Sequence, residues 1–150
     1  MFRGNFEHTV DDKGRVSVPA RFRDALVGSN DDRVVITKFP LPSGRCLEVY
    51  PLAVWVRLEE RMRQKPQFNH RVMRFMNFYF ANAHECVLDK QGRILLPTNL
   101  RSYAGLEKDV VLAGIIDKFR IWDKAQWDRV SAEHEQQIID NPEDLNELGI

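Results

Sequence analysis

The sequence predicts an α+β fold built from two similar halves, with further helices between and after them. The strongest observation is a repeat, because VDDKGRVSVP at 10–19 returns as LDKQGRILLP at 88–97, 78 residues later. Stretches of alternating apolar and polar residues, typical of β-strands, accompany the repeat, whereas residues 69–80 show helical spacing. Each half has only about 50 residues, too few to bury much core alone. We therefore expect the halves to share one core.

In the first half, the repeated motif predicts a tight turn between two strands. Asp11 can accept hydrogen bonds from backbone N–H groups, and Gly14 can adopt a positive φ, so these residues favour a turn. Pro19 suits the first turn of a short helix, which Gly28 can end. The predicted elements are strands at 6–10 and 16–18, a helix at 21–26, and strands at 34–38 and 46–50.

The second half repeats this order with shorter connections. Residues 34–36 correspond to 110–112 at an offset of 76, and 47–50 correspond to 119–122 at an offset of 72. The decreasing offset places the length differences in the connections, mainly at 39–44, which we expect to be a surface loop because loops tolerate insertions. The predicted elements are strands at 84–88 and 93–96, a helix at 98–103 ended by Gly105, and strands at 110–113 and 119–122.

Helices are expected between the halves and after the second one. Asn69 can cap a helix that carries an apolar stripe, and Asp123 with Gln126 resembles a capping box. The predicted helices cover 51–65, 69–80 and 125–139, and residues 141–150 are expected to fray. The predicted units are the first half at 5–54, connecting helices at 55–82, the second half at 83–126, and a C-terminal helix with an acidic tail at 127–150.

Composition indicates a globular protein with an uneven charge distribution. The 150 residues are 43% hydrophobic and 29% charged, and no apolar run approaches the roughly 18 residues of a membrane span. The net charge is zero, but residues 129–150 hold one basic and six acidic residues, which leaves 21 basic and 16 acidic residues elsewhere. The body thus carries +5, compatible with a basic binding face. Cys46 and Cys86 form no CxxC pair and are interpreted as core residues in the reducing cytoplasm.

The duplicated Asp-x-x-x-Arg motif, together with the opening Met1-Phe2-Arg3-Gly4, resembles the bacterial MraZ family. The segment DDKGRVSVP at 11–19 is similar to the hallmark of the SpoVT/AbrB-type DNA-binding fold, and the resemblance covers about residues 1–130. It implies two tandem AbrB-like swapped-hairpin β-barrel halves that form an intramolecular pseudo-dimer. It also implies a regulator, expected to be a repressor, of the division and cell-wall gene cluster. Such a protein would bind direct repeats in promoter DNA as a ring homo-oligomer and associate with the nucleoid.

The candidate DNA contacts are cations at the two predicted turns. A two-stranded ribbon fits the major groove, where Arg15 and Arg93 can each address a guanine, although a stable hairpin with a solvated arginine is the plainer alternative. Lys13 and Lys90 occupy shifted positions in the two copies, so the halves can read DNA unequally. The candidate residues are Arg15, Arg93, Lys13, Lys90 and Arg3 for DNA binding, and Asp11, Gly14, Asp89 and Gly92 for shaping the turns.

The remaining cations have more than one interpretation. Arg21, Arg23 and Arg101 lie on the short helices, where they can contact phosphate, pair within the chain or remain solvated. Residues 57–74 hold six basic and two acidic residues, and we interpret this run as a surface between chains or a general electrostatic surface. The aromatic residues at 75–80 are interpreted as core and subunit interface.

The sequence offers no pattern for catalysis or for a bound cofactor. The residues at 84–86 include metal-ligand types, but they alternate faces in a strand and match no zinc spacing. A Gly-rich phosphate loop, GxSxG and HExxH are all absent. We expect no enzyme activity, no cofactor, no small-molecule substrate and no membrane partner. The alternatives to a repressor are an AbrB-like antitoxin that binds a toxin through its acidic C-terminal arm, and a ring-forming scaffold with incidental DNA affinity.

Overall fold

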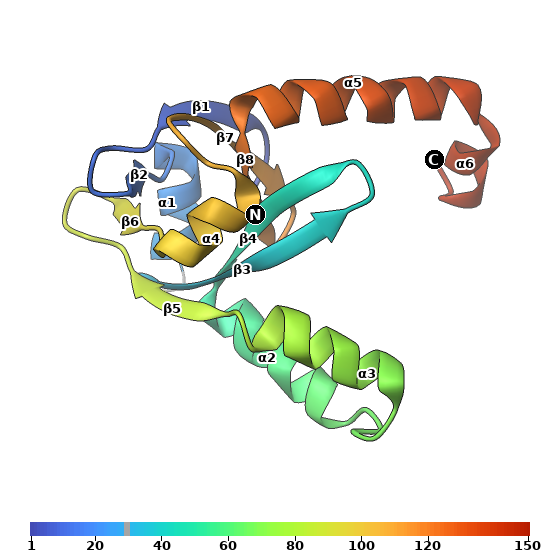
Figure 1. The fold of residues 1–150 in the computed structure, drawn as a ribbon, viewed down its shortest axis with the longest axis horizontal. Helices are drawn as coiled ribbons and strands as arrows, with labels where there is room; N and C mark the ends of the chain where they lie inside the picture. Colours follow the sequence, from blue (N-terminus) through green and yellow to red (C-terminus); the bar gives the residue numbers. More distant parts are fainter. Residues whose placement is uncertain (29–30) are drawn as a thin grey trace.

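The computed structural model describes residues 1–28 and 31–150 (Figure 1). The first half contains β1 (Asn5–Thr9), β2 (Arg15–Ser17), α1 (Ala20–Val27), β3 (Arg33–Leu41) and β4 (Gly44–Pro51). A helical arm, residues 52–80, follows with α2 (Leu52–Arg63), α3 (His70–Phe75) and the π-helix η1 (Met76–Phe80). The rest contains β5 (His84–Val87), β6 (Arg93–Leu95), α4 (Thr98–Ala104), β7 (Asp109–Ile115), β8 (Lys118–Asp123), α5 (Lys124–Asp140) and α6 (Glu143–Glu147). The predicted order of strands and short helices in each half is confirmed.

Strands from both halves are interleaved in one six-stranded antiparallel sheet of order β1-β7-β8-β4-β3-β5. β1 of the first half pairs with β7 of the second, and β5 of the second half pairs with β3 of the first. The two remaining strands, β2 and β6, pair with each other in a separate ribbon centred on Val16 and Ile94. The halves therefore cannot separate without loss of inter-strand hydrogen bonds.

Both halves bury side chains in one principal core, as the sequence predicts. Val16 and Ile94 from the ribbon are almost completely buried, together with Phe22 from α1 and Leu100 from α4. The ring of Phe22 lies 5.1 Å from that of Phe119 on β8. Full burial of such side chains contributes about 1.5–3 kcal/mol each. This core therefore holds the ribbon and both short helices against the sheet.

The predicted closure into β-barrels is not confirmed. Within the described residues, the sheet ends at β1 and β5, which do not pair with each other, and the β2–β6 ribbon stays separate. Each ribbon strand has only three residues, because Pro19 and Pro97 follow them and form the N-caps of α1 and α4. Proline has no N–H to donate to a strand partner but suits a helix start, so the ribbon ends there.

The surface loop predicted at 39–44 is wrong. β3 and β4 extend into this segment and pair as far as Leu41 and Gly44, which leaves only Pro42 and Ser43 as the connection. Pro40 is compatible with β3 because β5 pairs only with residues 33–36, so β3 is an edge strand at that point. The extra length in the first half therefore lengthens a hairpin.

The arm is anchored on the sheet by an aromatic cluster and by a buried charged group that the sequence did not reveal. Trp55 of α2 and Tyr79 of η1 are both buried against the sheet. The Tyr79 hydroxyl donates to Glu48 Oε1, and Arg120 Nε donates to Glu48 Oε2 at 2.9 Å. Glu48 is only 1% exposed. Burial, followed by the nearby Glu48 carboxylate, raises the pKa of Tyr79.

The structure divides one predicted helix of the arm, confirms the predicted cap of the C-terminal helix and adds a short helix after it. The stripe predicted as one helix at 69–80 divides into α3 and the π-helix η1. The side chain of Asp123 accepts a hydrogen bond from Gln126 N at 3.2 Å, so the predicted cap of α5 is confirmed. A short helix, α6, lies within the segment expected to fray. None of the helices in residues 1–28 and 31–150 is both long and apolar enough to cross a membrane.

Candidate nucleic-acid interface

The two repeated motifs fold into similar turns, the first turn at residues 11–15 and the second turn at residues 89–93. In the first turn, Asp11 Oδ1 accepts hydrogen bonds from Lys13 N at 3.0 Å and from Arg15 N at 2.8 Å. Asp89 Oδ1 accepts the equivalent two bonds in the second turn, both at 2.9 Å. Gly14 has a φ of +84°, a region that glycine adopts without steric cost. The repeated aspartate and glycine thus have the geometry expected of turn-shaping residues.

Each turn arginine is held by the aspartate four residues before it. Arg15 Nε donates to Asp11 Oδ2 at 2.7 Å, and Arg93 Nε donates to Asp89 Oδ2 at 2.9 Å. The backbone N–H of each arginine, followed by its guanidinium, lowers the pKa of the aspartate below its ordinary value. Arg93 Nη1 also lies 4.0 Å from Asp11 Oδ2, across the boundary between the halves. The arginine side chains remain 30% and 25% exposed, so they are oriented but accessible.

The two turns lie side by side because the strands that follow them, β2 and β6, pair with each other (Figure 1). Val18 N donates to the carbonyl oxygen of Gly92 at 2.9 Å, and Leu96 N donates to the carbonyl oxygen of Gly14 at 2.9 Å. Each turn is therefore hydrogen-bonded to the strand end of the other half. The duplicated motifs form one continuous surface with two matching halves.

Each turn glycine is covered by an arginine from the short helix of the other half. A Cβ atom on Gly14 would lie 2.8 Å from Cζ of Arg101, and one on Gly92 would lie 2.7 Å from Nη1 of Arg23. Arg101 Nε donates to the carbonyl oxygen of Leu96 at 3.3 Å, whereas Arg23 Nε is buried without a hydrogen-bond partner in the described part of the chain. The sequence indicated only that Arg23 and Arg101 occupy matching positions in the two halves. It did not reveal that each arginine lies over the turn of the other half.

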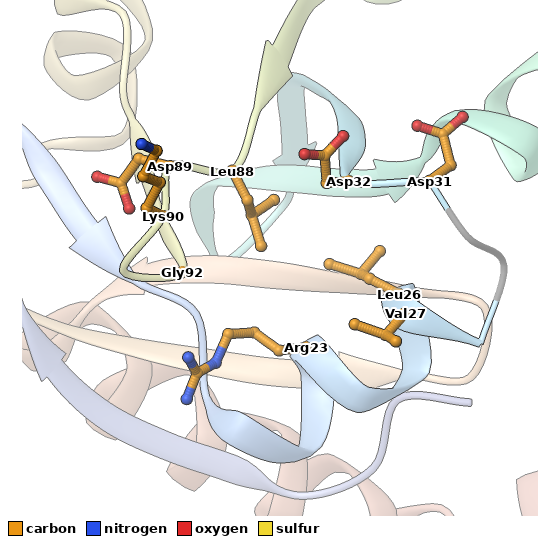
Figure 2. Close-up of a pocket in the computed structure, with 9 residues that line it drawn as sticks. All are labelled: Arg23, Leu26, Val27, Asp31, Asp32, Leu88, Asp89, Lys90 and Gly92. Atoms are coloured by element: carbon orange, nitrogen blue, oxygen red, sulfur yellow. The ribbon is translucent and has the colours of Figure 1, made fainter.

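A cavity of about 490 Å³ lies between α1 and the second turn, and Figure 2 shows Arg23 at one end of it and two aspartates at the other. Asp31 is paired with Arg33 at 2.9 Å. Three carboxylates and two cations line the cavity, so it is not a uniformly cationic site for an anion. Its lining residues are Arg23, Leu26, Val27, Asp31, Asp32, Leu88, Asp89, Lys90 and Gly92.

The other predicted DNA-binding cations are not all brought together. Lys13 and Lys90 are exposed on the two turns, and neither forms a salt bridge within residues 1–28 and 31–150. Arg3 is exposed as well, but it precedes β1 whereas the first turn follows it. Five strand residues, each rising about 3.3 Å, separate Arg3 from that turn. The arm with its basic run extends from the side of the sheet away from both turns (Figure 1).

The cysteines are placed as packing residues. Both are free, Cys46 is completely buried, and Cys86 is partly buried. Burial raises the pKa of the Cys46 thiol to about 12 and also raises the pKa of Cys86, so neither has the character of a reactive thiolate. The described residues contain no group of three or more side chains that could hold a metal ion.

Comparison with known proteins gives a consistent result over the whole chain. A family model described as "MraZ protein, putative antitoxin-like" matches twice, at residues 1–78 and at residues 79–147. A protein of Desulfitobacterium hafniense named "Transcriptional regulator MraZ" is 47% identical over 150 residues, which covers both chains completely. Proteins of the same name from Desulforamulus reducens and Pediococcus pentosaceus are 43% identical over 148 residues and 41% identical over 150 residues. These matches cover 97% and 100% of this chain and 99% and 100% of the relatives.

Proposed function

Because this chain belongs to the MraZ family, we propose that it is a DNA-binding transcriptional regulator whose contact surface is the pair of adjacent turns. The observation that carries the proposal is the juxtaposition of Arg15 and Arg93, each held by its own aspartate on one exposed surface. Both arginines use Nε for the hydrogen bond to their own aspartate, and the one further acidic contact of their terminal amino groups in the described residues is the 4.0 Å approach of Arg93 Nη1 to Asp11. A fixed guanidinium of this kind can address the N7 and O6 atoms of guanine in the major groove.

The distribution of charge supports this surface more than the net charge does. Lys13 and Lys90 stand beside the turn arginines and have no acidic partner among the described residues, so they can approach phosphates. Asp11 and Asp89 direct their carboxylates at backbone N–H groups and guanidinium groups of the turns. These contacts offset the repulsion that free carboxylates would exert on DNA. Arg3 would reach DNA at a separate point, beyond the other end of β1.

The finer proposal is a repressor of the division and cell-wall gene cluster that binds direct promoter repeats as a ring homo-oligomer. One chain offers a single pair of turns, whereas specific binding typically exceeds non-specific binding by about 10³–10⁷. Several linked chains gain affinity through effective concentration, provided that their sites are reached simultaneously. Repeats in one orientation, spaced near one helical turn of about 10 bp, satisfy that condition. The regulator would act in the cytoplasm, on the nucleoid.

A footprint on the DNA immediately upstream of the protein's own gene tests this function. Protection of repeated short sequences, with random-sequence DNA as the control, is the expected result. Insertion of half a helical turn between two repeats should weaken binding sharply, and insertion of a full turn should restore part of it. Equal binding to promoter and random DNA would instead support the scaffold alternative. Equal effects of the two insertions would contradict simultaneous binding to repeats.

The antitoxin alternative is retained because the description of the matching family includes the term antitoxin-like. It predicts a toxin partner that binds the acidic C-terminal segment, and a small toxin gene beside this gene. Division and peptidoglycan genes downstream would favour the repressor. Tandem-affinity purification from the native host distinguishes the two, since an antitoxin should recover one small protein in stoichiometric amount.

A further inference from the structure

One apolar stripe runs along α5, and only its first half is covered by the chain itself. Val130 is 2% exposed because it packs against Trp122 and Ala113 of the sheet. Ile138 and Ile139 continue the same stripe at helical spacing, but they are 51% and 63% exposed. Figure 1 shows that α5 extends beyond the sheet, with the short α6 near its far end.

A groove of about 450 Å³ opens along this stripe. Its lining is mainly apolar and comes from α5 and the sheet, including Leu41, Ile115, Trp127, Val130, Ile138 and Ile139. The lining includes Glu135 and also Arg120, which is paired with the buried Glu48 at 2.9 Å. Further acidic residues on α5 and α6 are Glu133, which is paired with Arg129, and Asp140, Glu143, Asp144 and Glu147. A partner for this groove therefore needs an apolar side chain within a basic surrounding.

The tip of the arm has that chemistry. Phe68, between α2 and α3, is 94% exposed. The basic residues around it in the chain are Arg61, Arg63, Lys65, Arg71 and Arg74, and none forms a salt bridge within residues 1–28 and 31–150. Arm residues 57–74 carry a net charge of +4. Residues 130–150 contain six acidic residues and no lysine or arginine. The same chain thus carries two complementary surfaces at separate places.

We propose that Phe68 of one copy inserts into the α5 groove of a second copy, with the basic arm facing the carboxylates of α5 and α6. This inference rests on the self-association in the proposed function and assigns it a surface. The two contact surfaces are different, so the junction is heterologous, and repetition of it closes a ring or extends a filament. The arm tip and α5 lie away from the turns, so the junction leaves the DNA-binding surface open.

The test is a mixing experiment on the full chain without DNA, followed by sedimentation velocity and light scattering. Phe68→Ala removes the inserted side chain, and Ile138→Asp places a charge in the groove. Both positions are exposed, and circular dichroism checks that the fold is retained. Val27→Asp, at a residue 70% exposed on α1, is the matched control. Each test variant should associate at least tenfold more weakly than the original chain, whereas the control should assemble normally.

The mixture of the two test variants is decisive. An equimolar mixture should form a heterodimer and stop there, because Phe68 of the Ile138→Asp chain can still enter the groove of the Phe68→Ala chain. Normal assembly by either test variant, a mixture without heterodimers, or an original chain that stays monomeric would overturn the proposal. Binding to a single DNA repeat, measured separately, tests the turns alone. Failure of one assay with success of the other therefore identifies which of the two proposals is wrong.

Discussion

Arg93 Nη1 lies 4.0 Å from Asp11 Oδ2, although the two residues are in different copies of the repeated motif. Asp11 therefore faces two guanidinium groups, its own Arg15 and Arg93 of the second turn. Asp89 forms a salt bridge with Arg93 only, within the described residues. Two motifs that match in sequence are thus unequal in the folded chain, and the first aspartate links both turns.

This asymmetry predicts that Asp11→Ala weakens DNA binding more than Asp89→Ala. Loss of Asp11 releases Arg15 and also removes the second acidic contact of Arg93, whereas loss of Asp89 releases Arg93 from its own aspartate but leaves Asp11 4.0 Å away. Titration of promoter DNA by fluorescence anisotropy measures the difference. Asp12→Ala is the matched control, since Asp12 is exposed and has no salt bridge in the described part of the chain, and it should bind DNA at least as well as the original. Equal losses at Asp11 and Asp89 would show that the link across the halves has no role.

Gly92→Ala should lower the free energy of unfolding by about 1–2 kcal/mol, because residue 92 has a φ of +73°. The added methyl group would also displace Arg23 from its place over the turn. Urea denaturation measures the change. Gly28→Ala is the control, because Gly28 has a helical φ of −58° and its nearest neighbour lies at 3.6 Å. If both variants have the original stability, the second turn does not require a left-handed residue.

Glu48→Ala should lower the free energy of unfolding by about 3–5 kcal/mol, since it leaves Arg120 without its buried partner. It also removes the acceptor of the Tyr79 hydroxyl, which anchors η1 to the sheet. Chemical denaturation gives the loss, and Glu85→Gln on the exposed β5 serves as control, with a change within about 0.5 kcal/mol. A Glu48→Ala protein as stable as the original would mean that the arm is held by apolar packing alone.

DNA binding should depend strongly on salt despite a net charge of zero. A plot of the logarithm of the binding constant against the logarithm of the salt concentration should have a negative slope. Each phosphate that the protein neutralises should contribute about 0.9 to the size of that slope. Lys13→Ala should reduce this slope by about 1. Arg45→Ala, near the tip of the β3–β4 hairpin and outside both the turns and the arm, should leave the slope unchanged. A nearly flat slope in the original chain would place its cations at other surfaces.

The repeat made the elements and the shared core predictable, because a copied pattern of strands, turn and proline marks the same unit twice. The turns were predictable because Asp11 and Gly14 have local conformational preferences that need no partner. Local patterns could not reveal which half supplies each contact. The position of Arg23 over Gly92 and the ion pair between Glu48 and Arg120 join residues about 70 positions apart, so only the folded chain shows them.

The open sheet and the long β3–β4 hairpin were missed for related reasons. Barrel closure was inferred from family resemblance, and the edges of a sheet depend on pairing between distant strands. Pro40 and Pro42 favoured a loop in the sequence, but one side of β3 has no strand partner at Pro40 among the described residues, so that proline is tolerated.

The most direct test of the account is promoter binding by Arg15→Ala, Arg93→Ala and the double variant, measured by anisotropy at fixed salt with Arg45→Ala as control. Each lost guanine contact should cost about 1–3 kcal/mol, and the double variant should bind promoter DNA no better than random DNA. Circular dichroism should remain that of the original chain in all four proteins. Promoter affinity retained by the double variant, with the fold intact, would contradict the assignment of the twin turns as the DNA-binding surface.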